Sequence, residues 1–157
     1  MLIKNNRFDE IVSDLNLRPP HFSDDSIIFA LSNASIIKIS DEEFPLVMKA
    51  IGEDFSGCTQ AAKKLCEEYP RIKLLLITLG PVGAFVYKPS TGEYFYQPGE
   101  KVDVKSTVGA GDSFAAAFVS HYLSGCSITA SLEKAVKLSA FVVSQNEAIP
   151  DYNIKNI

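Results

Sequence analysis

Short apolar runs alternate along the chain with stretches in which apolar residues recur at helical spacing. The runs 36–39 and 74–79 are almost continuously apolar or β-branched, which is typical of strands that are covered on both faces. Shorter strands are expected at 11–15, 84–87, 93–96 and 102–104. Helices are expected at 26–32, 40–51, 59–68, 109–124 and 129–145. This alternation predicts an α/β domain with a mostly parallel sheet.

Local signals refine the ends of these elements. Ser23 or Asp24 is positioned to cap the helix at 26–32. Ser40 and Glu43 have the spacing of a capping box, although Pro45 must then lie in or near the first turn. The turn residues at 89–92 predict a hairpin, and therefore an antiparallel edge to the sheet.

Composition and charge exclude several classes of protein. The 157 residues carry a net charge of −4 and contain no run of Lys or Arg, which argues against a nucleic-acid surface. The longest apolar stretches, 74–79 and 115–120, are too short to span a bilayer, so we expect no membrane partner. The first residues lack the apolar core of a signal peptide, and three widely spaced cysteines fit reduced thiols. These features predict a cytoplasmic protein.

The segment with the clearest chemical potential is Gly109-Ala110-Gly111-Asp112, at the start of a predicted helix. Backbone N–H groups at a helix N-terminus have no partner within the helix, and the helix dipole is positive there. Because no bulky side chain covers them, these groups can approach a phosphate oxygen. Asp112, beside this site, could accept a proton from a hydroxyl that attacks a phosphoryl group.

On the residues alone, a simpler interpretation stays open. Two glycines before a helix can make only a tight turn, and Asp near a helix start commonly caps N–H groups. Two other phosphate motifs do not fit. Phe114 stands where a dinucleotide-binding fingerprint needs glycine, and the Gly-Lys-Ser/Thr of a Walker A loop is absent.

The stretch 107–114, Thr-Val-Gly-Ala-Gly-Asp-Ser-Phe, closely resembles the C-terminal signature of PfkB (ribokinase-like) carbohydrate kinases. The resemblance implies a three-layer αβα fold and ATP-dependent phosphorylation of a sugar hydroxyl. It also implies that Gly109, Ala110 and Gly111 form an anion hole for the transferred phosphate and that Asp112 is the catalytic base.

Two further segments match the family in the same order. Thr78-Leu79-Gly80-Pro81-Val82-Gly83 resembles a turn that lines the nucleotide site, which implies ATP-binding roles for Thr78, Gly80 and Gly83. Ser40 and Glu43 occupy the place of an Asn-x-x-Glu motif, which implies that Glu43 acts on Mg²⁺ through water. The capping-box interpretation of this pair holds beside the functional one.

The stretch 14–20, Asp-Leu-Asn-Leu-Arg-Pro-Pro, resembles a segment of fructokinases and ketodeoxygluconate kinases. The resemblance implies that Asp14, Asn16 and Arg18 bind the sugar substrate, with Arg18 close to the transferred phosphate. A guanidinium suits a phosphate or a sugar acid. A surface arginine after a strand is the alternative.

Two positions depart from the family pattern around its monovalent-cation site. Ser106 stands where the family usually has Asp, and Glu147 stands where many members have Gly. Potassium dependence is therefore doubtful. The stretch 135–150 resembles the helix and loop that pack near adenine.

The resemblance covers residues 1–157 but corresponds to the C-terminal, ATP-binding half of the family's fold, without its N-terminal sugar-binding and lid portion. The sequence therefore predicts a partial carbohydrate kinase that uses ATP and Mg²⁺. A non-catalytic nucleotide-binding or interaction module is the main alternative, and an oxidoreductase is nearly excluded by Phe114. The strand at 11–15 is expected to expose an unpaired apolar edge, through which the chain would self-associate.

Overall fold

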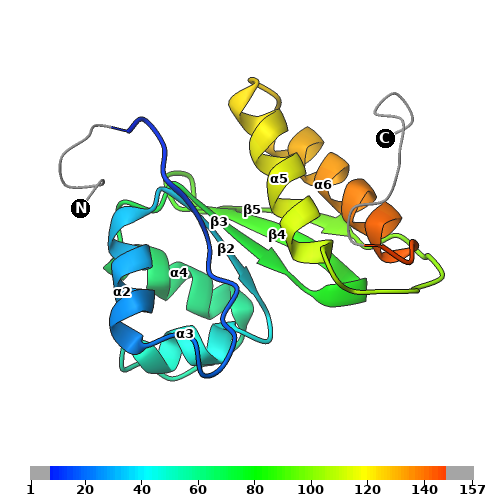
Figure 1. Cartoon of the computed structure of the whole chain (residues 1–157). Helices are drawn as coiled ribbons and strands as arrows, with labels where there is room; N and C mark the ends of the chain where they lie inside the picture. The colour runs from blue at the N-terminus through cyan, green and yellow to red at the C-terminus, as the bar shows by residue number, and fades with distance from the viewer. Residues whose placement is uncertain (1–7, 148–157) are drawn as a thin grey trace. The chain divides into compact units, whose positions relative to one another are not determined.

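The protein was analysed as a computed structural model, in which residues 8–147 are described. Figure 1 shows strands and helices in the order expected of an α/β protein. The strands are β1 (Val12–Asp14), β2 (Ile36–Ser40), β3 (Leu74–Thr78), β4 (Gly83–Lys88) and β5 (Glu93–Pro98). The helices are α2 (Asp24–Asn33), α3 (Phe44–Ala50), α4 (Cys58–Glu68), the 3₁₀ turn η1 (Gly80–Val82), α5 (Ala110–Leu123) and α6 (Ile128–Val143).

The five strands form one sheet in the order β1-β2-β3-β4-β5. β1 runs parallel to β2, with Val12 opposite Ile36 and Asp14 opposite Lys38. β4 and β5 are joined by the four residues 89–92, a connection length typical of an antiparallel hairpin. The mixed sheet with a hairpin at one edge confirms the predicted α/β class.

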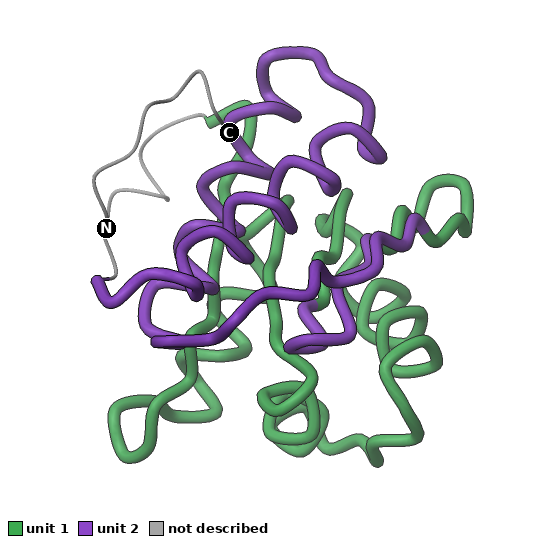
Figure 2. The backbone as a smooth tube through the Cα atoms, turned by 90° about the vertical axis from the view of Figure 1, so that its right-hand side faces the viewer, with its two compact units in different colours: residues 1–77, 87–94 green, residues 78–86, 95–157 purple. Residues whose placement is uncertain are grey.

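The chain divides into two compact units, which Figure 2 shows in different colours. The first unit comprises residues 1–77 and 87–94, and the second comprises residues 78–86 and 95–157. Each unit has apolar side chains of its own that are withdrawn from solvent.

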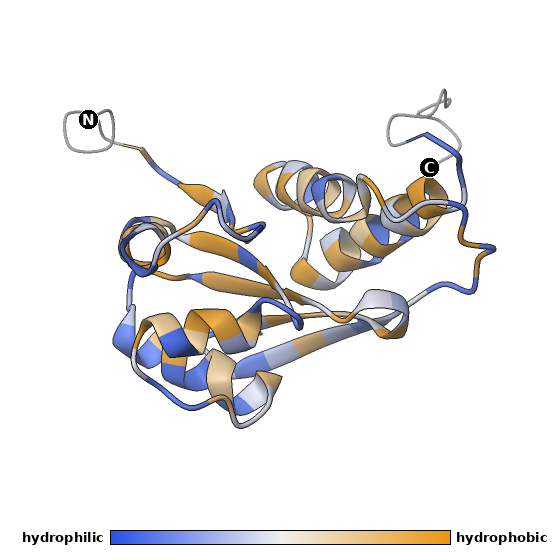
Figure 3. Ribbon diagram, turned by 60° about the horizontal axis from the view of Figure 1, so that its bottom comes forward, coloured by the Kyte–Doolittle hydropathy of each residue, from blue (hydrophilic) through white to orange (hydrophobic). Residues whose placement is uncertain are grey.

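In the first unit, β2 and β3 supply the centre of the core. Ile37, Leu75 and Ile77 are fully buried, as the continuous apolar runs predict. Helix α3 packs against both α2 and α4. The helices carry apolar stripes (Figure 3), and Leu31 of α2 and Leu65 of α4 lie on the buried side of theirs.

In the second unit, α5 and α6 pack along each other. Phe118 of α5 is fully buried, as is Ala135 of α6, while Phe114 and Leu132 are nearly so. Small residues between these large ones let the two helices approach closely. Gly109 immediately precedes α5, so this pairing also anchors the helix start that carries the candidate phosphate site.

Two helix starts test the capping predictions. Ser23 caps α2: its Oγ accepts a hydrogen bond from the N–H of Ser26, and its own N–H donates to the Oγ of Ser26. Helix α3 begins at Phe44, so the predicted start at Ser40 is wrong. Pro45 has no N–H to donate to residue 41, which prevents the helical ladder from extending back that far.

The predicted strand at 102–104 is also wrong, because these residues have no regular structure. Val104 is 56% exposed and Val102 is 37% exposed. Their alternation therefore buries no apolar face, and a strand gains little stability without one. Pro150, at the end of the stretch that resembles an adenine-contacting loop, lies outside the described residues.

The described part of the chain contains neither a membrane-spanning helix nor a cluster of metal-binding side chains. None of its helices has the length and apolar character needed to cross a membrane. No group of three or more His, Cys, Asp or Glu side chains within residues 8–147 is arranged to hold a metal ion.

Candidate active site

The acceptor-side candidates lie at the end of β1 and in the loop that follows it. The Nζ of Lys38 lies 2.9 and 3.1 Å from the two carboxylate oxygens of Asp14. Lys38 is nearly buried, with 7% of its surface exposed. Asp14, expected to contact substrate, therefore has its carboxylate paired with a lysine from the neighbouring strand.

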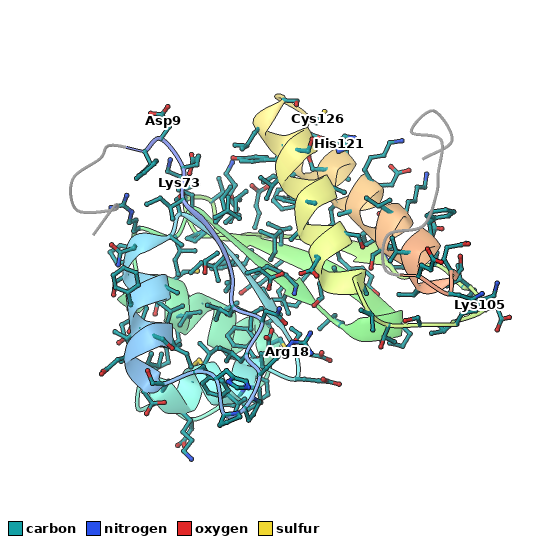
Figure 4. All side chains as sticks on the ribbon, viewed as in Figure 1. Asp9, Arg18, Lys73, Lys105, His121 and Cys126 are labelled. Carbon is teal, nitrogen blue, oxygen red and sulfur yellow. The ribbon has the colours of Figure 1, made fainter. Side chains whose placement is uncertain are left out.

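Beyond β1, the loop places Arg18 at the surface (Figure 4). Asn16 has the positive φ of 42° that asparagine tolerates better than most residues. Its Oδ1 accepts a hydrogen bond of 3.2 Å from the Nε of Arg18. An open pocket of about 350 Å³ adjoins the loop and is lined by residues 13–18, His21, Phe22, Ser26, Ile27 and Ala30.

Glu43 connects this loop to the end of β2. Its Oε2 accepts hydrogen bonds from the N–H of Ser40 at 2.8 Å and from the Oγ of Ser40 at 2.9 Å. Its Oε1 accepts the N–H of Leu17 at 2.5 Å. The Oγ of Ser40 also accepts the N–H of Glu43, so the reciprocal contacts of a capping box form even though the helix starts later.

The glycine turn after β3 is shaped by close backbone packing. Gly80 and Gly83 have φ values of 54° and 127°, which favour glycine. A Cβ on Gly83 would lie 2.2 Å from the carbonyl oxygen of Gln97. Thr78 ends β3, and the N–H of Leu79 donates to the carbonyl of Gly83 at 2.8 Å, which closes the turn.

The start of α5 leaves backbone donors available. Gly109 precedes the helix at φ 83° and provides no side-chain cap. The N–H of Ala110 donates to Thr107, and the helical ladder begins with the N–H of Ser113 donating to Gly109 at 2.9 Å. Within residues 8–147, the N–H groups of Gly111 and Asp112 therefore have no acceptor inside the helix.

The first residue of α5 is held firmly. The carbonyl oxygen of Ala110 accepts hydrogen bonds of 3.0 Å from Ser113 and from Ser139 of α6. Asp112 is exposed, and in the described residues its carboxylate forms no hydrogen bond or ion pair. A fixed helix start beside an exposed carboxylate can both bind an anion and accept a proton.

Other candidate groups are already engaged. The Oγ of Ser106 accepts the N–H of Val108 at 3.2 Å, so it supports the turn before α5.

Burial, followed by the charge of Glu67, raises the pKa of Cys66 to about 12. A thiol with so high a pKa stays protonated and is a poor nucleophile.

The structure brings together the predicted residues of the first unit, because Glu43 contacts both Ser40 and the loop of Asn16 and Arg18. The predicted residues of the second unit lie at two separate places in its sequence, the turn at 78–83 and the helix start at 109–112. Sequence analysis missed Lys38. A lysine inside an otherwise apolar, buried strand was the available signal, since such a cation needs a partner.

Comparisons with known proteins show the family to which the chain belongs. Residues 2–155 match the family described as pfkB family carbohydrate kinase. The chain belongs to this family. Its relatives include a probable chloroplastic fructokinase-6 of Arabidopsis thaliana, which is 38% identical over 121 residues, covering 73% of this chain and 29% of that protein. A 5-dehydro-2-deoxygluconokinase of Shouchella clausii is 34% identical over 149 residues, covering 90% of this chain and 44% of that protein.

Solved structures of ribokinase-type kinases share the fold. A putative ribokinase II from E. coli in its apo form superposes with a TM-score of 0.76 at 24% identity, covering 88% of this chain and 44% of that chain. The same protein in complex with ATP and Mg²⁺ gives a TM-score of 0.72 at 23% identity, covering 86% and 42%. The ribokinase-like fold is therefore confirmed, and the chain spans less than half the length of the relatives it matches.

Proposed function

We propose that this chain forms the ATP-binding and catalytic-base portion of a carbohydrate kinase that transfers the γ-phosphoryl group of ATP to a sugar hydroxyl. The observation that carries the proposal is the start of α5. There, the N–H groups of Gly111 and Asp112 have no helical acceptor, and an exposed carboxylate lies on the same turn. Residues 1–157 then correspond to the C-terminal portion of the kinase domain.

In the proposed reaction, the carboxylate of Asp112 takes the proton of the sugar hydroxyl. The hydroxyl oxygen forms a bond to the γ-phosphorus, and the bond from that phosphorus to the bridging oxygen breaks, so the electron pair leaves with ADP. The amides around Gly109–Gly111 stabilise the charge on the transferred group. The turn of Gly80 and Gly83, with Thr78, supports the nucleotide.

The residues present fit a magnesium ion that is held mainly by water and phosphate. Mg²⁺ usually keeps several waters and takes one or two carboxylates, so the absence of a three-ligand cluster in the described residues is compatible with it. Glu43 would contact a metal-bound water through Oε1, which accepts only the hydrogen bond from Leu17 among the described residues. The ion would neutralise charge on the phosphates.

We infer that the acceptor is a ketose or a sugar acid, because Arg18 presents a guanidinium near an open pocket. The names of the fructokinase and the 5-dehydro-2-deoxygluconokinase support this substrate class. We propose no role for potassium in the reaction, since Ser106 and Glu147 replace the residues typical of the cation site.

We also propose self-association through β1, which lies at one end of the sheet.

A second candidate function is nucleotide binding without catalysis. The backbone amides at the start of α5 can bind a phosphate whether or not Asp112 accepts a proton. The two candidates therefore share the nucleotide site and differ in phosphoryl transfer.

One pair of measurements tests the proposal. Calorimetric titration of the chain with ATP and Mg²⁺ is expected to show binding in the millimolar range or tighter. Radiolabelled ATP with fructose or ketodeoxygluconate is expected to yield a labelled sugar phosphate when the chain is supplied with the N-terminal portion of the family's fold. Binding without transfer would favour the second candidate, and no binding at millimolar ATP would contradict both.

A further inference from the structure

We propose that Glu43 is a positioning residue for residues 16–18 after β1, the acceptor loop, because its carboxylate fixes the backbone that presents Arg18. Glu43 would thus act on the sugar side of the reaction, in addition to any action on magnesium. The effect on catalysis rests on the proposed kinase function, whereas the mechanical role of Glu43 does not.

The contacts of Glu43 divide between two elements. One carboxylate oxygen accepts both donors of Ser40, at the end of β2. The other accepts the N–H of Leu17, in the loop after β1. Only 9% of the surface of Glu43 is exposed, so water competes little for these hydrogen bonds.

The bond from Leu17 is the principal tether of this loop. Leu15 is still held by the β2 backbone, through the carbonyl of Lys38. In the described part of the chain, residues 16–18 form one hydrogen bond to another element, which is the bond from Leu17 to Glu43. Arg18 contacts Asn16 inside the loop, so the position of its guanidinium depends on the backbone that Glu43 holds.

The site requires a carboxylate and not merely a polar group. Backbone N–H donors face Glu43 from both sides, from Leu17 and from Ser40. A carboxylate accepts on both oxygens, whereas a glutamine of the same shape accepts on one side and places an NH₂ group against the other N–H. Glu43→Gln must therefore lose one of the two connections.

Amide hydrogen exchange of the ¹⁵N-labelled chain tests the tether without any need for activity. Glu43→Ala removes both acceptor oxygens and is expected to raise the exchange rate of the Leu17 N–H by about tenfold or more, since bonds to charged groups are the stronger ones. Glu42→Ala is the matched control, because Glu42 is the exposed neighbouring acid. Equal Leu17 exchange in the wild type and Glu43→Ala would overturn the proposal.

A milder variant guards against a failure to fold. Ser40→Ala removes one of the bonds that orient Glu43 and leaves the bond from Leu17 possible. It is expected to raise Leu17 exchange by a smaller factor, about threefold. If Glu43→Ala does not fold, Glu43→Gln replaces it: unchanged exchange of both the Leu17 N–H and the Ser40 N–H in Glu43→Gln would overturn the tether, because glutamine cannot accept from both.

A double-mutant cycle separates positioning of Arg18 from any effect on magnesium. If Glu43 acts on the sugar through Arg18, Glu43→Ala should raise the sugar KM of the wild type but add little to the sugar KM of Arg18→Ala. Additive effects on the sugar KM would overturn the coupling to Arg18. If the wild-type chain transfers no phosphate even with the N-terminal portion of the fold supplied, the kinase proposal fails, and Leu17 exchange still decides whether Glu43 tethers the loop.

Discussion

Lys38 of β2 lies directly opposite Asp14 of β1, and its Nζ contacts both carboxylate oxygens, at 2.9 and 3.1 Å. The lysine side chain is 8% exposed and the aspartate side chain 21%. The pair therefore joins the edge strand to its neighbour at a position that is largely shielded from solvent. Because Asp14 lies two residues before Asn16, the pair also fixes where the acceptor loop begins.

Removing one member of this pair should destabilise the fold. Lys38→Met leaves the Asp14 carboxylate without its buried cation, and breaking such a pair costs about 3–5 kcal/mol when fully buried. Because Asp14 is partly exposed, we expect the lower end of that range in urea unfolding. Lys137→Met, which breaks an exposed pair with Glu133, is the control and should cost much less, because solvent screens an exposed pair. Equal losses in the two variants would contradict this account.

Gly83 should be far less tolerant of alanine than Gly92. A Cβ at Gly83 would approach the Gln97 carbonyl to 2.2 Å, whereas Gly92, at φ 71°, has open space around it. Gly92→Ala should cost about 1–2 kcal/mol for the left-handed backbone alone. Gly83→Ala should cost at least about 1–3 kcal/mol more because of the clash, measured by thermal or urea unfolding. Similar costs would show that the backbone around Gly83 moves enough to accommodate the added Cβ.

The contacts of Glu10 should make stability depend on pH in the acid range. Burial alone would raise the pKa of Glu10, but hydrogen bonds from Lys73 and Ser35 and the charge of Lys73 outweigh it and lower the pKa below its ordinary value of 4.5. A lowered pKa in the folded state means that the ionised group stabilises the fold above the unfolded pKa. This contribution is lost as the pH falls through the lower, folded value.

Unfolding of the wild type and Glu10→Gln at several pH values measures this effect. The difference in unfolding free energy should be present at pH 7 and should disappear well below pH 4. Glu42→Gln, which alters an exposed acid in the same unit, should show no such trend. A difference that persists unchanged in acid would mean that the contacts of Glu10 do not depend on its charge.

Much of the fold could be predicted from local pattern. Continuous apolar runs predicted β2 and β3, and the glycines at 109 and 125 predicted the two ends of α5. Such elements can be predicted because burial and backbone freedom depend on residue types close together in the sequence. The alternation of Val102 and Val104 led to the wrong prediction of a strand at 102–104, since alternation does not reveal whether a neighbouring strand exists. The spacing of Ser40 and Glu43 predicted their mutual hydrogen bonds, but not the third contact to Leu17, which comes from 26 residues away. Contacts of that kind depend on tertiary structure and leave no short-range signal.

The role proposed for Asp112 gives the most decisive prediction. Asp112→Asn keeps the size and hydrogen-bonding capacity of the side chain but removes the proton acceptor and the negative charge. As Asp112 lies in the first turn of α5, the variant should lose only the interaction of that charge with the helix dipole, about 0.3–1 kcal/mol in unfolding experiments. ATP affinity should be retained, because the backbone amides remain.

Sugar phosphorylation, measured with the N-terminal portion of the family's fold supplied, should in contrast fall by about two to four orders of magnitude, the usual contribution of a general base. Asp103→Asn, an exposed acid in the same unit, is the control and should keep wild-type turnover. If Asp112→Asn retains phosphoryl transfer, Asp112 is not the base. If the variant instead loses several kcal/mol of stability along with its activity, the carboxylate serves chiefly to stabilise the helix start. A large loss of turnover with near-normal stability and ATP binding is the one combination that requires Asp112 to take the proton.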